Sequence, residues 1–195
     1  MPVPTGDIGP VPEGREAGPY DRLRRRVLWS LPTGLYVVGS RAGDRANLMT
    51  ANLVVQVATT PKLVAVAVEA GSVTRTLIEE GGGFSVCVLD RADRALVRRF
   101  VQPADRVDRD ESGALAALQG EPVHEVGGGL PVLDASVGWL ACAVRSVRDP
   151  GGDPTSPASH VLCIGEVVDA DGAADGAEGP AEVLRMEDTR MHYGG

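Results

Sequence analysis

Short runs of β-branched and apolar residues dominate the first half of the chain. They cover residues 35–40, 49–58 and 63–68. Turn-forming residues at 41–44 separate the first two runs, and residues 59–61, which include a proline, separate the second and third. Because a parallel connection needs about a dozen residues of crossover, these closely spaced runs predict adjacent antiparallel strands.

The same kinds of sequence pattern predict strands and helices along the rest of the chain. Further strands are predicted over 84–89, 137–147 and 161–169, with a closing strand over 182–186. Apolar residues at helical spacing predict short helices over 20–30, 72–80 and 92–101, and residues 149–159 and 171–180 have the composition of loops. Many short strands with a few short helices predict a mainly β, barrel-like fold rather than a doubly wound sheet.

The N-terminal segment differs from the remainder in composition. Residues 1–19 are rich in proline and glycine and show no apolar period, which predicts a disordered tail. The chain has 195 residues, within the usual size of one domain. We therefore expect a single domain over residues 20–195.

Charge and composition exclude several classes of protein. The chain carries 19 Lys and Arg against 27 Asp and Glu, a formal net charge of −8, which argues against a nucleic-acid partner because such binders depend on a basic face. No apolar run approaches the roughly 20 residues of a membrane span, and the N-terminus lacks the features of a signal peptide. These observations predict a cytoplasmic protein that contacts no membrane.

The usual catalytic and metal-binding patterns are missing from the sequence. There is no H-E-x-x-H, G-x-S-x-G or G-x-x-x-x-G-K-[ST]. Cys87, Cys142 and Cys163 form no C-x-x-C pair and lie within apolar runs, so they are interpreted as small core residues. His124 and His160 are interpreted as surface or capped residues, and the charged stretch 105–110 as a solvated loop. We expect no metal site, and the resemblance described below further implies no indispensable catalytic acid or base.

Residues 47–52 are unusual for a strand because they combine asparagine and alanine with apolar neighbours. One interpretation is a bulged strand edge. The other is a surface of backbone and short side chains that lines a planar ligand, where larger side chains would block its approach.

Residues 69–74 connect a predicted strand to a predicted helix. Free N–H groups at a helix start, beside the hydroxyls of Ser72 and Thr74, would suit a phosphate. The alternative is simple capping of the helix by Ser72. Arg75, Arg98 or Arg99 could add positive charge to a phosphate site.

The motifs resemble, in order, those of the flavin reductase-like FMN-binding family, the split β-barrel proteins. Thr33-Gly34 with Val37-Val38 resembles the family's T-G-V-x-V-V, 47–52 its N-G-M-T-A-S, and Pro61 with 63–68 its P-P-L-V-A-V-S-V. Ser72 and Thr74 with Leu77-Ile78 resemble S-x-T-x-x-x-I, and 98–100 its R-R-F. Later segments, 129–133, 139–142 and 164–167, resemble G-x-P-V-L, W-L-E-C and I-G-E-V. The resemblance runs from about Leu23 to Tyr193.

The resemblance implies an antiparallel, Greek-key-like split barrel that forms a homodimer with FMN, or FAD, near the subunit interface. The implied cofactor-binding residues are Asn47, Met49, Thr50, Ala51, Asn52, Ser72, Thr74, Arg99 and Phe100. The family's C-terminal H-R-G-R-Y-G appears as 189–194, which points to Arg190, His192 and Tyr193 for the nicotinamide or substrate. The chain departs from the family pattern at Leu48 and Val101, where the family has glycine, and at Thr189, where it has histidine.

The implied activity is hydride transfer from NADH or NADPH to flavin, with a monooxygenase as a partner that receives reduced flavin. Two alternatives remain. The flavin could be a tightly held prosthetic group that reduces another small acceptor, or the chain could be a non-catalytic flavin-binding module.

Overall fold

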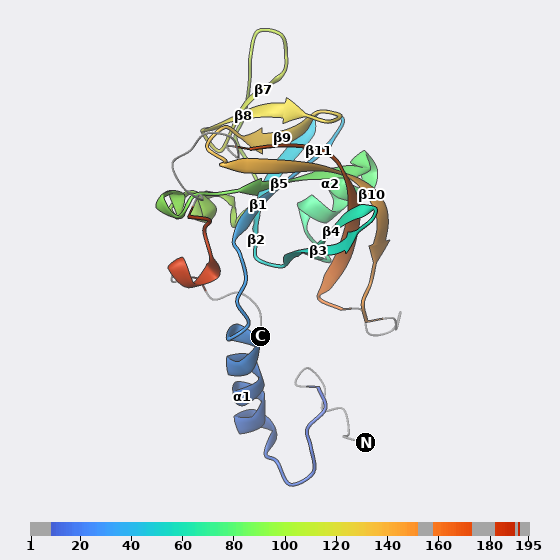
Figure 1. Cartoon of the computed structure of the whole chain (residues 1–195), viewed down its shortest axis with the longest axis vertical. Helices are drawn as coiled ribbons and strands as arrows, with labels where there is room; N and C mark the ends of the chain where they lie inside the picture. The colour runs from blue at the N-terminus through green and yellow to red at the C-terminus, as the bar shows by residue number, and fades with distance from the viewer. Residues whose placement is uncertain (1–8, 152–157, 173–181, 190, 192–195) are drawn as a thin grey trace. The chain divides into compact units, whose positions relative to one another are not determined.

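A computed structural model describes residues 9–151, 158–172, 182–189 and 191 (Figure 1). Its contacts divide the chain into two units, Met1–Pro32 with Thr189–Gly195, and Thr33–Asp188. The first unit contains helix α1 (Ala17–Trp29), in which Asp21 pairs with Arg24 at 2.8 Å, one turn away. This helix begins at Ala17 rather than at the predicted residue 20, so the segment predicted as a tail contributes its first turn.

The second unit is built on a seven-stranded sheet in which every neighbouring pair is antiparallel. Its strands are β1 (Tyr36–Ala42), β2 (Arg45–Ala51), β3 (Val54–Thr59), β4 (Lys62–Glu69), β5 (Gly83–Val88), β10 (Gly138–Arg148) and β11 (His160–Gly172). The strand order is β2-β1-β5-β10-β11-β4-β3. The predicted mainly β, antiparallel fold is therefore confirmed.

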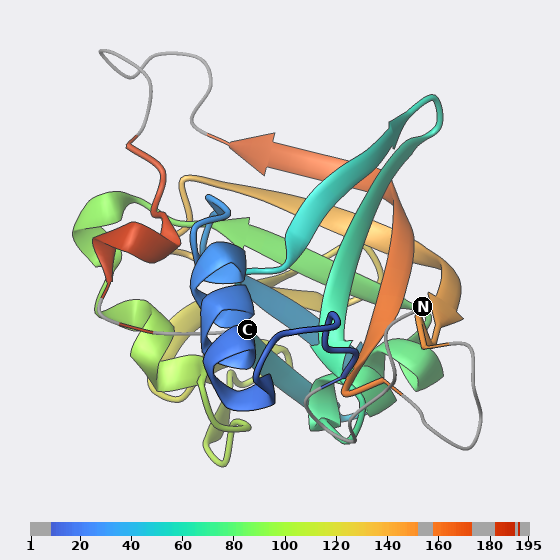
Figure 2. The same cartoon turned by 90° about the horizontal axis from the view of Figure 1, so that it is seen from below.

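The prediction of one strand over 49–58 is wrong, because the chain breaks there into β2 and β3. β2 pairs with β1 and β3 pairs with β4, so the two strands lie at opposite edges of the same sheet. Only Asn52 and Leu53 connect them. Three Cα steps span at most about 11 Å, so the sheet must curl until its two edges nearly meet. This near-closure gives the sheet the form of a split barrel, and Figure 2 shows the β3–β4 hairpin (teal) extending at one side of it.

Helix α2 (Val73–Gly81) fills the inside of the curled sheet. Its Ile78 is fully buried in a cluster with Val38 of β1, Val66 of β4 and Phe84 of β5. The helix contacts strands from both halves of the sheet, which explains why an apolar stripe is needed along it. The helix predicted over 72–80 is confirmed.

A second, four-stranded sheet covers the outside of β1 and β5 and was not predicted. It contains β6 (Val107–Arg109), β7 (Leu115–Leu118), β8 (Glu121–Val126) and β9 (Leu130–Leu133). The Ser85 hydroxyl of β5 donates to the Pro131 carbonyl of β9 at 2.5 Å. A side chain at Gly39 would overlap that same carbonyl, so the close approach of the two sheets depends on glycine there. The predicted solvated loop 105–110 is wrong in part, because it contains β6.

Two further predicted elements differ from the structure. The helix expected over 92–101 is replaced by two short 3₁₀ segments, η2 (Arg91–Asp93) and η3 (Leu96–Phe100). Val97 and Phe100 are buried under the sheet. This packing, rather than a helical repeat of apolar residues, determines the conformation of the segment. The closing strand expected over 182–186 makes isolated bridges at Val183 and Arg185, and η4 (Met186–Asp188) follows.

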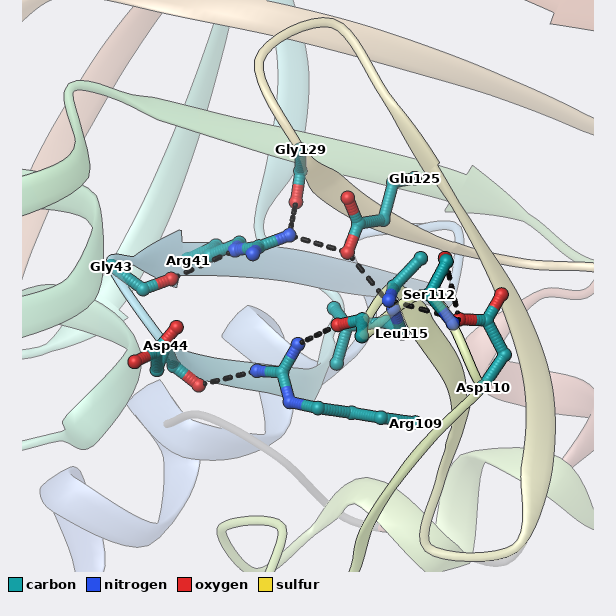
Figure 3. Close-up of polar contacts among 11 residues, drawn as sticks. Arg41, Gly43, Asp44, Arg109, Asp110, Ser112, Leu115, Glu125 and Gly129 are labelled. Atoms are coloured by element: carbon teal, nitrogen blue, oxygen red, sulfur yellow. Dashed lines mark hydrogen bonds and ion pairs between the residues drawn. The ribbon is translucent and has the colours of Figure 1, made fainter.

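A polar network joins three hairpins at the end of the sheet nearest the β1–β2 turn (Figure 3). Arg41 of β1 donates to the Glu125 carboxylate of β8 at 2.5 Å. The Leu115 N–H of β7 donates to the same carboxylate oxygen at 3.0 Å, and Arg109 of β6 donates to the Asp44 carbonyl at 2.8 Å. The Leu115 N–H, more than Arg41, lowers the pKa of Glu125 below its usual value.

We predict that Glu125→Gln lowers the free energy of unfolding by about 1 kcal/mol at neutral pH, a modest value because the pair is partly exposed. The folded-state pKa of Glu125 lies below the unfolded one. The stabilisation is therefore present above the unfolded-state pKa, about 4.3, and is lost as the pH falls through the folded-state pKa. Urea unfolding at pH 7 and in acid measures both values. Glu111→Gln, in the turn between β6 and β7, is the control, and an equal loss at both pH values would contradict the account.

Candidate functional site

The predicted cofactor segment lies on β2, whose residues alternate between two faces of the sheet. Asn47, Met49 and Ala51 are directly opposite Ser40, Val38 and Tyr36 of β1, so they share the inner face with α2. Met49 is half-buried there, whereas Asn47 and Ala51 are buried.

Leu48 lies on the opposite face and is fully buried. Its partner across the ladder is Gly39, and the absent side chain of that glycine leaves room for leucine. The substitution of the family's glycine by Leu48 therefore fills the layer between the two sheets. It does not extend to the face that carries Met49.

Asn47 joins the predicted flavin and phosphate segments through one buried hydrogen bond, and it makes a second, partly buried one to the chain after η3. Its side-chain N–H donates to the Thr74 hydroxyl in the first turn of α2 at 2.9 Å. Its side-chain carbonyl accepts from the Ala104 N–H, just after η3, at 2.7 Å. Asn47 is 3% exposed and Thr74 is 1% exposed. The two side chains are hydrogen-bonded to each other, and they hold the surrounding segments in place.

Thr50 makes the corresponding link on the outer face. Its hydroxyl donates to the Val97 carbonyl of η3 at 2.5 Å in a buried position. The hydroxyl of Thr50 is therefore committed to the protein itself. Through Asn47 and Thr50, β2 holds α2 on one side and the η3 segment on the other.

Asn52 follows the end of β2 and differs from Asn47 in one decisive respect. It is 9% exposed, yet its side-chain amide has no hydrogen-bond partner among the described residues. A nearly buried amide without a protein partner is costly unless solvent or a ligand satisfies it. Of the predicted polar residues on this segment, Asn52 is the one that remains available to a ligand.

The start of α2 presents unpaired donors. The Ser72 hydroxyl caps the helix by accepting from the Arg75 N–H at 3.2 Å, so the capping interpretation is correct. The backbone N–H groups of Val73 and Thr74 have no acceptor among the described residues. These two donors, at the positive end of a nine-residue helix, suit an anion. Capping and phosphate binding are therefore compatible here.

The predicted arginine and aromatic residues of η3 have different surroundings. Phe100 is 1% exposed, so its ring belongs to the core. Arg99 is exposed and pairs with Glu121 of β8 at 2.8 Å, a partner that no sequence signal indicated. Arg98 is exposed and makes no ion pair within the described residues. Arg190, His192 and Tyr193 lie outside the described residues.

The three cysteines confirm their interpretation as core residues. All are free and buried. Burial raises the pKa of Cys87 and Cys142 to about 12 and that of Cys163 to about 11. Thiols with such values stay protonated at neutral pH and are poor nucleophiles. Among the described residues no group of His, Cys, Asp and Glu is placed to hold a metal ion, and no helix there is long and apolar enough to cross a bilayer.

Comparison with known proteins identifies relatives over most of the chain. Residues 28–194 match the family described as "Flavin reductase like domain". The chain is 30% identical to high molecular weight rubredoxin of Moorella thermoacetica over 147 residues, which cover 74% of this chain and 58% of that protein. It is 29% identical to the NADH-dependent FAD reductase of Streptomyces globisporus, with 82% and 81% covered. The chain thus spans little more than half of the first relative and most of the second.

Solved structures agree with these relatives. The NADH:FAD oxidoreductase SgcE6 of Streptomyces globisporus C-1027 superposes with a TM-score of 0.64 at 26% identity, covering 84% of this chain and 89% of that one. A second structure of SgcE6 contains NAD and FAD fragments and superposes with a TM-score of 0.61 at the same identity, covering 79% and 84%.

We predict that Asn47→Ala mainly lowers the stability of the fold, whereas Asn52→Ala mainly weakens flavin binding. Removing the Asn47 amide leaves the buried Thr74 hydroxyl and the partly buried Ala104 N–H without their partner, so the free energy of unfolding falls by about 2 kcal/mol. Asn52→Ala changes it by less than about 1 kcal/mol, because no protein bond is lost, and instead weakens flavin binding. Urea unfolding without flavin and a flavin titration measure the two effects. Equal destabilisation by both variants would contradict the assignment.

Proposed function

The chain belongs to the flavin reductase-like family, and we propose that it binds FMN or FAD and transfers hydride to it from NADH or NADPH. The observation that carries this proposal is the convergence of three segments on Asn47. This residue holds the start of α2, the β2 strand and the chain after η3 together. The unpaired donors at the start of α2 and the amide of Asn52, just after β2, are the groups left to hold a ligand.

The start of α2 supplies the binding site for the flavin phosphate in this proposal. The N–H groups of Val73 and Thr74 donate to the phosphate oxygens, and the Ser72 hydroxyl keeps the helix start rigid. The exposed guanidinium groups of Arg98 and Arg99 add positive charge.

Met49, Ala51 and Asn52 bind the flavin ring and ribityl chain. Met49 offers a half-buried, polarisable surface to the ring, and Ala51 keeps the backbone accessible. The Asn52 amide donates to and accepts from the polar edge of the ligand. Bound flavin supplies the hydride-accepting atom N5, so the side chains need only orient the ring and exclude water.

Relatives support the choice of cofactors. One is named an NADH-dependent FAD reductase, and the SgcE6 structure contains both NAD and FAD fragments. We propose NADH or NADPH as the hydride donor, with Arg190, His192 and Tyr193 contacting the nicotinamide. A monooxygenase is the proposed acceptor of reduced flavin, and the cytoplasm, where reduced thiols such as Cys87 persist, is the proposed location.

A second candidate function keeps the flavin as a prosthetic group. The relative from Moorella is named a rubredoxin, and its region similar to this chain is 58% of a longer protein. In that arrangement the flavin passes electrons to another acceptor without leaving its site.

Flavin exchange separates the two functions. A protein that releases reduced flavin oxidises NADH only when free FMN or FAD is added, and it loses bound flavin on dialysis. A prosthetic flavoprotein keeps its flavin through dialysis and reduces an added acceptor. Flavin binding with no nucleotide oxidation under either condition would leave only a binding role.

We predict that Arg99→Gln weakens FMN binding about tenfold while leaving riboflavin binding unchanged, because riboflavin lacks the phosphate. Loss of one charge-assisted hydrogen bond, about 1.5 kcal/mol, corresponds to that factor. Flavin fluorescence titration gives both constants. Arg145→Gln, which removes an arginine paired with Glu166 elsewhere on the sheet, is the matched control. Equal weakening of both ligands would place the phosphate elsewhere.

We further propose that the chain forms a homodimer through β3, an edge strand of the seven-stranded sheet. Leu53, Val55 and Val57 on and beside this strand are 43%, 59% and 50% exposed. An apolar edge strand with unpaired backbone groups associates readily with another chain. A second copy of this chain is the partner that the family resemblance implies.

We predict that the double variant Val55→Glu/Val57→Glu is monomeric, whereas the wild-type chain is dimeric. Each glutamate would place a charge in the apolar interface, which is costly without a partner. Sedimentation equilibrium measures the mass of both. Val107→Glu, an equivalent change at an exposed valine of β6, should remain dimeric. A dimeric double variant would move the interface to another surface.

A further inference from the structure

A cavity of about 270 Å³ lies at the junction of the two sheets, apart from the flavin site. His124 of β8, Asp134 and Ser136 after β9, Trp139 of β10 and Asp171 of β11 are among the residues that line it. None of these residues belongs to the flavin, phosphate or nicotinamide sets.

The register of the sheet separates this cavity from the flavin segment. Ala51, Tyr36, Val88, Gly138 and Gly172 form one continuous cross-strand row through β2, β1, β5, β10 and β11. Neighbouring strands lie about 4.8 Å apart, so four steps place Gly172 about 19 Å along the sheet from Ala51. Gly138 and Gly172, which line the cavity, therefore lie three and four strands of the curved sheet away from Ala51 of the proposed flavin segment.

The size of the cavity limits its occupant. Drug-sized ligands occupy pockets of about 300 to 1,000 Å³, and one water takes about 30 Å³. A pocket of about 270 Å³ that opens to solvent admits a small organic molecule.

The charged residues that line the cavity determine whether it favours a positively or a negatively charged ligand. Asp134 and Asp171 contribute carboxylates, and no Arg or Lys is among the described residues that line the cavity. His124 donates from Nδ1 to the Asp134 carboxylate at 2.6 Å, which fixes both side chains. One oxygen of Asp171 accepts from the Gly172 N–H, and no bond to its other oxygen occurs within the described residues. An anion is therefore disfavoured and a cation is favoured.

An aromatic wall favours an organic cation over a metal ion. The Trp139 indole meets the His124 ring edge to face, with centroids 6.4 Å apart and planes at 71°. A tryptophan face attracts ammonium groups more strongly than any other side-chain ring. The described residues contain no group of His, Asp and Glu arranged to hold a metal ion.

We propose that this cavity binds a small organic amine in its ammonium form, with the charge between the Asp134 and Asp171 carboxylates and the carbon skeleton against Trp139. This site is independent of the proposed flavin chemistry.

The test uses the fluorescence of Trp139 in a Trp29→Phe background, in which Trp139 is the sole tryptophan. The probes are benzylamine and benzyl alcohol, which have nearly the same shape and differ in charge. We expect benzylamine to change the emission in a saturable way with a Kd of about 1 mM, in the range of efficient small ligands. Benzyl alcohol should bind at least about tenfold more weakly. Equal binding of both probes, or saturation by neither, would overturn the proposal.

Asp171→Asn and Asp134→Asn test the carboxylates directly. Asparagine keeps the oxygen that accepts from Gly172 N–H or from His124, so the local structure is retained while the charge is lost. Each variant should weaken benzylamine binding at least about fivefold, a value typical of a lost ion pair at a partly exposed site. Asp44→Asn, at the opposite end of the sheet, makes the same change in net charge and should leave binding unchanged.

Two controls separate this proposal from others. FMN binding and flavin reduction should be unchanged in Asp171→Asn, so failure of the flavin activity and failure of amine binding are independent results. Trp139→Ala, followed by saturation-transfer NMR of benzylamine, checks the aromatic wall without the fluorescent reporter. Unchanged benzylamine signals in that variant would contradict the proposed site.

Discussion

The buried amide of Asn47 is the contact on which the arrangement of the proposed flavin site depends. It bonds simultaneously to the Thr74 hydroxyl in α2 and to the Ala104 N–H beyond η3. Inside a protein such a bond is hard to replace, because an orphaned partner keeps the full cost of desolvation. The strand, the helix start and the η3 segment are therefore fixed together. The start of α2 consequently keeps its free N–H groups in a constant position beside β2.

The curled sheet makes this arrangement possible. Because only Asn52 and Leu53 join β2 to β3, the two edges of the sheet must approach each other around α2. The flavin segment therefore lies at the seam of the barrel, where one strand ends and the opposite edge begins. This position explains why Asn52 is nearly buried without a protein partner, and why the apolar edge strand β3 beside it is a natural place for a second subunit.

Sequence reasoning predicted the elements whose pattern is local and missed those set by long-range pairing. The β1–β2 turn, helix α2 and its Ser72 cap follow from nearby residues and are correct. The break at Asn52 was missed because β2 and β3 have the same apolar composition, and only their pairing partners separate them. Asn47, Thr50 and Thr74 were predicted to bind the cofactor, and their side chains form hydrogen bonds within the protein. Composition alone gave no sign that Asn47 would be engaged and Asn52 open.

The central claim is that this chain binds flavin and reduces it with a nicotinamide nucleotide. The most direct test is anaerobic stopped-flow mixing of the full chain and FMN with NADH and, separately, NADPH, while the flavin absorbance is followed. The account predicts that at least one nucleotide bleaches the flavin much faster than it does without protein, at a rate that saturates with nucleotide concentration. Flavin that is bound by the protein but bleached by neither nucleotide would contradict it.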